Sequence, residues 1–106
     1  MQIGLVIEAT LKDLTTRGQA FYILQRGNYA SGLIVVKLNA LDGNCRLLTQ
    51  QRNYLEDKLE WAPALQEEIV SEVDADAWIE RSKQRDPDLW VIEIEDRAMK
   101  NAFELI

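Results

Sequence analysis

The chain has 106 residues, of which 47% are apolar and 28% charged, and this is typical of one compact domain covering residues 1–106. The net charge of −6 divides unevenly, because residues 1–53 carry +3 and residues 54–106 carry −9. An acidic chain without a long Lys/Arg cluster is poorly suited to nucleic acid, so we expect no nucleic-acid partner.

Cysteine and histidine content excludes several classes of enzyme. Cys45 is the only cysteine and histidine is absent, so Ser-His and Cys-His catalysis, intramolecular disulfides and zinc hydrolase sites lack their parts. We predict no metal and no cofactor. No stretch resembles a secretion signal or a membrane span, so we expect a soluble cytoplasmic protein with no membrane partner.

The first half of the chain predicts one helix followed by strands. Apolar residues at spacings of three and four predict an amphipathic helix over residues 3–17, closed by Gly18. Two β-rich runs, Ala20–Arg26 and Leu33–Leu38, flank a turn-forming cluster and predict a hairpin. The Asp42-Gly43 step then predicts a third, antiparallel strand over Cys45–Arg52.

The second half predicts a short strand, a helix and a last strand. The short strand covers Leu59–Ala62 near an edge of the sheet, because Pro63 stops it. Ser71 caps a helix that continues to about Gln84. Asp86-Pro87-Asp88 then forms a turn before the strand Leu89–Glu95, and residues 97–106 form either a short helix or a tail.

This order predicts an α+β fold, with an antiparallel sheet of four to five strands and both helices packed on one face. Alternation assigns one sheet face to Ile34, Val36, Leu38, Trp90, Ile92 and Ile94. The other face is mixed and holds Leu33, Val35, Lys37, Leu89, Val91, Glu93 and Glu95. We expect the apolar end of this mixed face to be covered by the C-terminal segment, through Phe103 and Ile106, or by a second copy of the protein.

Glu93 and Glu95 are the first candidates for chemistry, since alternate strand residues point to the same side, roughly 7 Å apart. We favour a structural role, in which they are charges on a strand face, paired with Lys37 or Arg46. If so, Glu93→Lys lowers the melting temperature more than Glu67→Lys does.

Other side chains also have two interpretations, and we favour the structural one for each. Four aspartates could serve as ligands for a cation, but their spacing matches no calcium loop. Asp74 and Asp76 are explained by the first turn of a helix, where carboxylates complement the helix dipole. Asp86 and Asp88 are explained by a tight turn around Pro87, where aspartate commonly bonds its own backbone. Cys45 is expected to be a buried thiol rather than a reactive one. The three tryptophans are expected in the core rather than on a binding platform, and they are Trp61, Trp78 and Trp90. The glycines of residues 27–32 form no phosphate loop.

Two segments carry a family resemblance, Val36–Gly43 and above all Arg85–Asp96, which contains Asp-Pro-Asp-Leu-Trp. With these segments the chain resembles a family of short bacterial proteins known only as a domain of unknown function, number 1491. The resemblance covers nearly the whole chain, except the tail from Arg97 to Ile106. It implies a small bacterial single-domain protein with no assigned activity, so it supplies no catalytic or binding residues.

The sequence does not identify a biochemical activity. Our leading hypothesis is a non-enzymatic domain that self-associates or binds a protein partner, through the mixed sheet face or an apolar tail cluster formed by Ala98, Met99, Phe103, Leu105 and Ile106. The alternative is a small-molecule binding protein or a carboxylate-based enzyme, for which the candidates are Glu93, Glu95, Asp86 and Asp88. That alternative requires two of these carboxylates to converge on a pocket beside a tryptophan.

Overall fold

The computed structural model describes residues 2–104 and has an α+β fold, as predicted. Both helices and the main strands lie close to their predicted ranges. The elements in chain order are α1 (Ile3–Thr16), β1 (Phe21–Gln25), β2 (Ile34–Asn39), β3 (Asn44–Asn53), β4 (Lys58–Pro63), β5 (Val70–Ser71), α2 (Glu72–Arg85) and β6 (Trp90–Glu95). All six strands join one sheet, one or two more than expected, because the two-residue β5 also pairs with β3.

The strand order is β1-β6-β2-β3-β4, so the predicted hairpin between β1 and β2 is wrong. The last strand lies between them, antiparallel to β1 and parallel to β2, while the other pairs are antiparallel. The reason lies in β6, where Trp90, Val91 and Ile92 are all buried although alternate residues face opposite sides. A strand that is apolar on both faces is stable in the middle of a sheet. The prediction that β4 lies at an edge is confirmed.

The loop between β1 and β2 therefore passes over the start of β6. The Asn28 amide donates to the Asp88 carbonyl at 2.9 Å, and Trp90 Nε1 donates to the Asn28 carbonyl at 2.9 Å. A Cβ atom on Gly27 would lie 2.2 Å from the Asp88 carbonyl oxygen, and one on Gly32 would lie 2.3 Å from it. Only glycine allows the two backbones to approach this closely.

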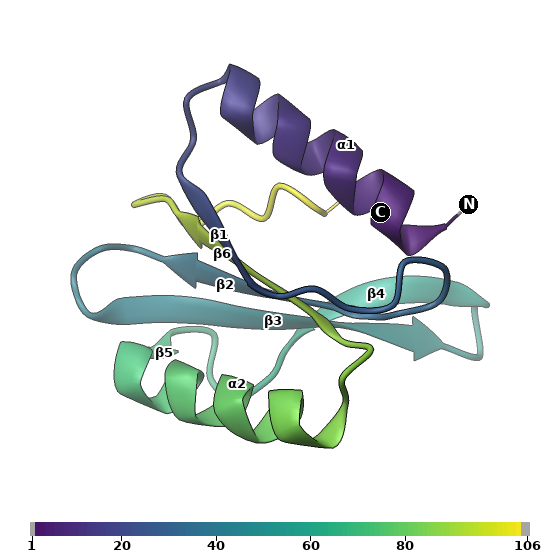
Figure 1. Ribbon diagram of the computed structural model, residues 1–106. Helices are drawn as coiled ribbons and strands as arrows, with labels where there is room; N and C mark the ends of the chain where they lie inside the picture. The colour runs from purple at the N-terminus through teal and green to yellow at the C-terminus, as the bar shows by residue number, and fades with distance from the viewer. Residues whose placement is uncertain (1, 105–106) are drawn as a thin grey trace.

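The two helices cover opposite faces of the sheet, with α1 on one side and α2 on the other (Figure 1). The expectation that both helices share one face is wrong, because the strands carry apolar residues on both faces. The face predicted to be apolar packs under α1, in a core of Ile7, Leu11, Leu14, Ile34, Val36, Leu38, Leu48, Trp90, Ile92, Ile94 and Phe103. The mixed face packs under α2, in a second core of Val35, Cys45, Leu47, Ala75, Ile79, Leu89 and Val91.

Neither the C-terminal segment nor a second copy is needed to cover the mixed face, since α2 covers it. Phe103 packs instead in the core under α1 and is fully buried, whereas Ile106 lies outside the described residues. Residues 97–104 form turns without a helix or strand, which favours the tail over the short helix. We call residues 97–104 the C-terminal strap.

Local signals at the helix ends are confirmed. Gly18 follows α1 with a φ of +72°, a left-handed conformation that glycine adopts at little cost. Ser71 Oγ accepts a hydrogen bond from the Asp74 amide at 3.1 Å at the start of α2. The Asp86 carboxylate accepts from the Asp88 amide at 3.0 Å in the turn after this helix. Neither described helix is long and apolar enough to cross a membrane.

Candidate functional sites

The most prominent polar cluster surrounds Lys37, which lies on β2 under α2. Its side chain is 3% exposed, and its Nζ lies 2.8 Å from Glu72 Oε2 and 3.3 Å from Glu93 Oε2. A third carboxylate, Asp76, has its Oδ1 2.7 Å from the same nitrogen. The predicted pairing of Glu93 with Lys37 is confirmed, and it arises because these residues are direct neighbours in the parallel register of β2 and β6.

Asn39 completes this group, which we call the Lys37 cluster. Its Nδ2 donates to Glu72 Oε2 at 3.0 Å and to Glu93 Oε2 at 2.9 Å, and its Oδ1 accepts from the Leu41 amide at 2.8 Å. The carboxylates of α2 and β6 are thus held by donors from β2. Buried charges need such partners, because an unpaired one costs several kcal/mol. The cluster ties α2 to the sheet.

The charge state of Lys37 restricts what the cluster can do. Burial alone lowers the pKa of the Lys37 ammonium, but the hydrogen bonds to Asp76 and Glu72 and the charge of Glu93 outweigh it and raise that pKa above its ordinary value. A nucleophilic or basic lysine requires the neutral amine. Lys37 is therefore a fixed cation, suited to holding the fold together.

The carboxylates proposed for catalysis do not converge. Glu93 belongs to the Lys37 cluster, whereas Glu95 Oε1 accepts from Tyr22 Oη at 3.4 Å. Asp86 is the only one of the four candidates that lines the 310 Å³ pocket beside Trp78. The condition set for a carboxylate-based enzyme, two of these groups beside a tryptophan, is not met there.

The aspartates considered as cation ligands have separate environments. Asp76, expected only to complement the helix dipole, also pairs with Lys37, while Asp74 is exposed in the first turn of α2. Over residues 2–104, no three side chains from His, Cys, Asp and Glu are arranged to hold a metal ion.

Cys45 is fully buried in the core under α2, as predicted. Burial raises the pKa of its thiol to about 11, although the Lys37 charge acts in the opposite direction. A thiol with a raised pKa and no solvent access is a poor nucleophile. Cys45 thus acts as a small apolar core residue.

The tryptophans do not form a common platform. Trp90 is buried under α1, while Trp61 and Trp78 are half-buried against different cores on opposite faces of the sheet. The core interpretation is confirmed for Trp90.

Among the described residues, the most exposed large apolar side chains lie in the turn between β3 and β4, and no sequence pattern had indicated them. Tyr54 is 84% exposed and Leu55 is 99% exposed. Asn53 holds this turn, because its Oδ1 accepts from the Leu55 and Glu56 amides at 3.0 and 3.2 Å. Its Nδ2 also donates to Glu60 at 2.9 Å. We call residues 53–58 the hairpin tip, and it lies at the right-hand edge of the molecule in Figure 1.

A comparison with protein families identifies the chain's relatives. The model of a family described as a protein of unknown function, DUF1491, matches residues 1–104. The chain belongs to the DUF1491 family. The predicted resemblance is therefore confirmed, and it extends into the strap that had no place in the predicted pattern.

Solved structures of DUF1491 proteins have the same fold. The crystal structure of a DUF1491 protein from Caulobacter crescentus CB15 is similar, with a TM-score of 0.80, 26% identity, and coverage of 97% of this chain and 94% of that one. An NMR structure of a DUF1491 protein from the same organism has a TM-score of 0.74, 27% identity and coverage of 90% and 84%. The solution structure of an A. tumefaciens protein shares the fold, with a TM-score of 0.67, 24% identity and coverage of 91% and 86%. No curated protein matches the chain.

Proposed function

We propose that this DUF1491 protein is a non-enzymatic interaction domain that binds another protein through its hairpin tip. The observation that carries the proposal is the near-complete exposure of Tyr54 and Leu55 on a turn held by side-chain hydrogen bonds. The proposal includes the cytoplasmic location expected from the sequence.

The hairpin tip is a better candidate for an interaction surface than the mixed sheet face or the tail cluster, which the sequence suggested. The mixed sheet face lies under α2, and Phe103 of the tail cluster is buried in the core under α1. Leu105 and Ile106 lie outside the described residues. The hairpin tip, in contrast, presents its apolar side chains to solvent.

The chemistry of the tip suits a protein partner. Tyrosine is enriched in protein interfaces, where its ring is buried and its hydroxyl forms a hydrogen bond. Asn53 and the ion pair between Lys58 and Glu56, at 2.9 Å, hold the turn in shape. A turn that is already ordered loses less conformational entropy on binding. The expected partner surface is an apolar pocket with a polar rim.

A capture experiment with matched variants tests this function. The wild-type chain, the double variant Tyr54→Ser/Leu55→Ser and the control Val73→Ser are immobilised, and extracts of cells that make the protein are passed over them. Val73 is 78% exposed on α2 and so matches the tip in exposure. We expect one partner, purified after capture, to bind the wild type and the control alike and the double variant at least about ten times more weakly.

Two outcomes would contradict the proposal. One is a partner that binds all three chains with the same affinity. The other is that the tip mediates only self-association, which sedimentation would show as a wild-type dimer that the double variant does not form.

A further inference from the structure

The sheet has two open edges, and β1 is the edge strand that lacks both charges and proline. Edge strands commonly carry charged residues or proline, which hinder pairing with another chain. The other edge strand, β4, contains Lys58 and Glu60 and ends at Pro63. Residues 18–25, which include all of β1, have no charged residue and no proline. The β1 edge is therefore suited to pairing with a further strand.

The backbone of β1 presents hydrogen-bonding groups at this edge. The Glu95 amide donates to the Ala20 carbonyl at 3.1 Å, so Ala20 faces β6, and Tyr22 two residues later faces it as well. Phe21 and Ile23 alternate with them and turn their N–H and C=O groups away from β6. Within residues 2–104, no other segment bonds to these groups. A strand added here gains backbone hydrogen bonds.

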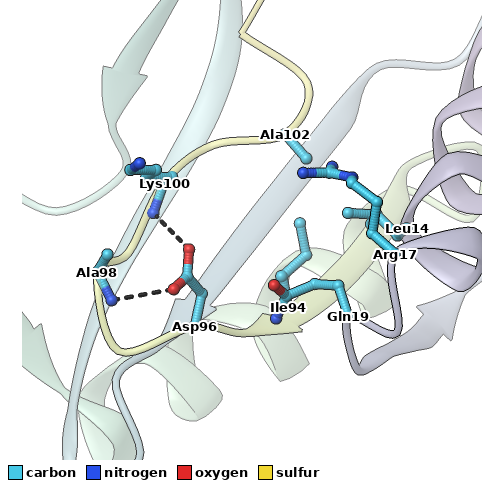
Figure 2. Close-up of a pocket in the computed structure, with 8 residues that line it drawn as sticks. All are labelled: Leu14, Arg17, Gln19, Ile94, Asp96, Ala98, Lys100 and Ala102. Atoms are coloured by element: carbon cyan, nitrogen blue, oxygen red, sulfur yellow. Dashed lines mark hydrogen bonds between the residues drawn. The ribbon is translucent and has the colours of Figure 1, made fainter.

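Side-chain hydrogen bonds fix both ends of β1. Before the strand, Gln19 Nε2 donates to the Glu95 carbonyl, and Gln19 and Ile94 line one pocket of about 280 Å³ (Figure 2). At the last residue of the strand, Gln25 Nε2 donates to the Leu89 carbonyl at 2.7 Å. A strand that is already ordered loses less conformational entropy when it binds.

A second copy of this chain fits the edge, because β1 is complementary to itself. When two copies lie antiparallel about a two-fold axis at Tyr22, Phe21 of each copy faces Ile23 of the other. The two Tyr22 side chains then lie opposite each other, and each is 49% exposed in the single chain. Aromatic side chains opposite each other on paired strands stabilise the pairing. Within β1 no charged side chains meet, although each chain carries a net charge of −6.

We propose that the protein forms a homodimer through β1, in which one continuous sheet runs across both copies. Phe21 of each copy exchanges backbone hydrogen bonds with Ile23 of the other, in both directions. Because β4 lies at the opposite edge of the sheet, the hairpin tips of both copies stay accessible, and the inference does not depend on the proposed function.

The short length of the contact makes this dimer weak. The register of β1 with β6 shifts after Ile23, at a bulge, so regular pairing is limited to Ala20–Ile23. So short a contact buries less than the roughly 1,200 Å² that stable interfaces reach. We expect a dissociation constant between about 10 µM and 1 mM.

Sedimentation equilibrium and NMR spectra of the ¹⁵N-labelled chain test the dimer over about 20 µM to 1 mM, a range that covers the expected dissociation constant. We expect the average mass to rise toward that of a dimer, and the Phe21 and Ile23 amide signals to shift as the concentration rises. The Leu59 amide of β4 is the control and keeps its position. A monomer over the whole range overturns the proposal. Shifts at Leu59 without shifts at Phe21 and Ile23 overturn it as well.

A charge substitution at the axis provides the first variant. Tyr22→Lys places two ammonium groups opposite each other. Leu5→Lys makes the same change on α1, at a side chain of similar exposure, 53%. We expect Tyr22→Lys to weaken dimerisation at least about tenfold and Leu5→Lys to leave it unchanged. Equal dimerisation of Tyr22→Lys and the wild type overturns the proposal.

A cysteine at the axis provides a second variant, which decides the question if Tyr22→Lys does not fold. The Cα atoms of residues opposite each other in such a pair are about 4.5 Å apart, within the range of a disulfide. In a buffer of oxidised and reduced glutathione, we expect Tyr22→Cys to form a covalent dimer at least about ten times faster than Leu5→Cys. Cys45 is buried and does not compete. Equal rates for the two variants overturn the proposal.

Discussion

Lys37 links the sheet to α2 through two carboxylates, Glu72 and Asp76, and pairs within the sheet with a third, Glu93, and these partners explain a buried charge in a small domain. Glu72 and Asp76 are four residues apart and thus on the same side of α2, where both reach the Lys37 ammonium. Breaking a buried ion pair leaves an uncompensated charge, which costs more than the intact pair contributes. Substitutions within the Lys37 cluster are therefore expected to be among the most destabilising of the polar changes.

Glu93→Lys tests this expectation against Glu67→Lys, which makes the same charge change on an exposed residue. Glu93 Oε2 lies 3.3 Å from Lys37 Nζ and its side chain is only 13% exposed, so the variant places two ammonium groups together. We expect a loss of about 3 kcal/mol or more in the free energy of unfolding, against about 0.5 kcal/mol for Glu67→Lys. Urea denaturation measures both. Equal losses would show that Glu93 is not part of a buried pair.

High pH tests the charge state of Lys37. Its pKa in the folded chain is raised above the ordinary value of 10.5, so its contribution is complete below that pH and declines above it. We expect the stability difference between wild type and Lys37→Met to be constant up to about pH 10 and to shrink at higher pH. The exposed control Lys58→Met corrects for general alkaline effects. A difference that stays constant through this range would contradict the account.

At the scale of elements, the central feature is the place of β6 between β1 and β2. The last strand enters the middle of the sheet, and the loop from β1 to β2 crosses its first residues. Gly27 and Gly32 allow this crossing, because a Cβ atom on either would collide with the Asp88 carbonyl oxygen. The loop and β6 thus stabilise each other.

Gly27→Ala tests the crossing directly. The added Cβ would lie 2.2 Å from a backbone oxygen, so the loop or the start of β6 must shift. We expect a loss of about 2 kcal/mol or more in the free energy of unfolding. Ser31→Ala in the same exposed loop is the control and should cost about 0.5 kcal/mol or less. If thermal and urea unfolding show the same stability for both variants, the close approach does not matter for the fold.

At the scale of the whole molecule, the two oppositely charged halves of the chain meet in ion pairs. Lys37 and Arg46 from the basic half pair with Glu72, Asp76, Glu93 and Glu68 from the acidic half. The net charge of −6 is thus compatible with complementary charges inside the fold.

Local patterns predicted the elements, but not how they come together. Periodicity located α1 and α2, and alternation assigned Val36 and Ile92 to one sheet face and Lys37 and Glu93 to the other. Alternation states which face a residue occupies but not which strands are neighbours, so the position of β6 was missed. The pairing of Lys37 with α2 was missed because both helices were expected on one face, whereas α2 covers the face that carries Lys37. The i, i+4 spacing of Glu72 and Asp76 was the available sequence signal for it.

The hairpin tip was missed for a different reason. Its polar residues mark a turn, and a turn pattern does not show whether the preceding Tyr54 and Leu55 pack against the sheet or face solvent. Only the three-dimensional structure shows that they are 84% and 99% exposed.

Site-specific photo-crosslinking tests the proposed interaction most directly. A photoreactive amino acid replaces Leu55 in one chain and Val73 in another, and both chains are irradiated in the cells that make the protein. We predict an adduct with one other protein from position 55 and none from position 73. The absence of an adduct at position 55, the same adducts from both positions, or a crosslink only to a second copy of this chain would contradict the account.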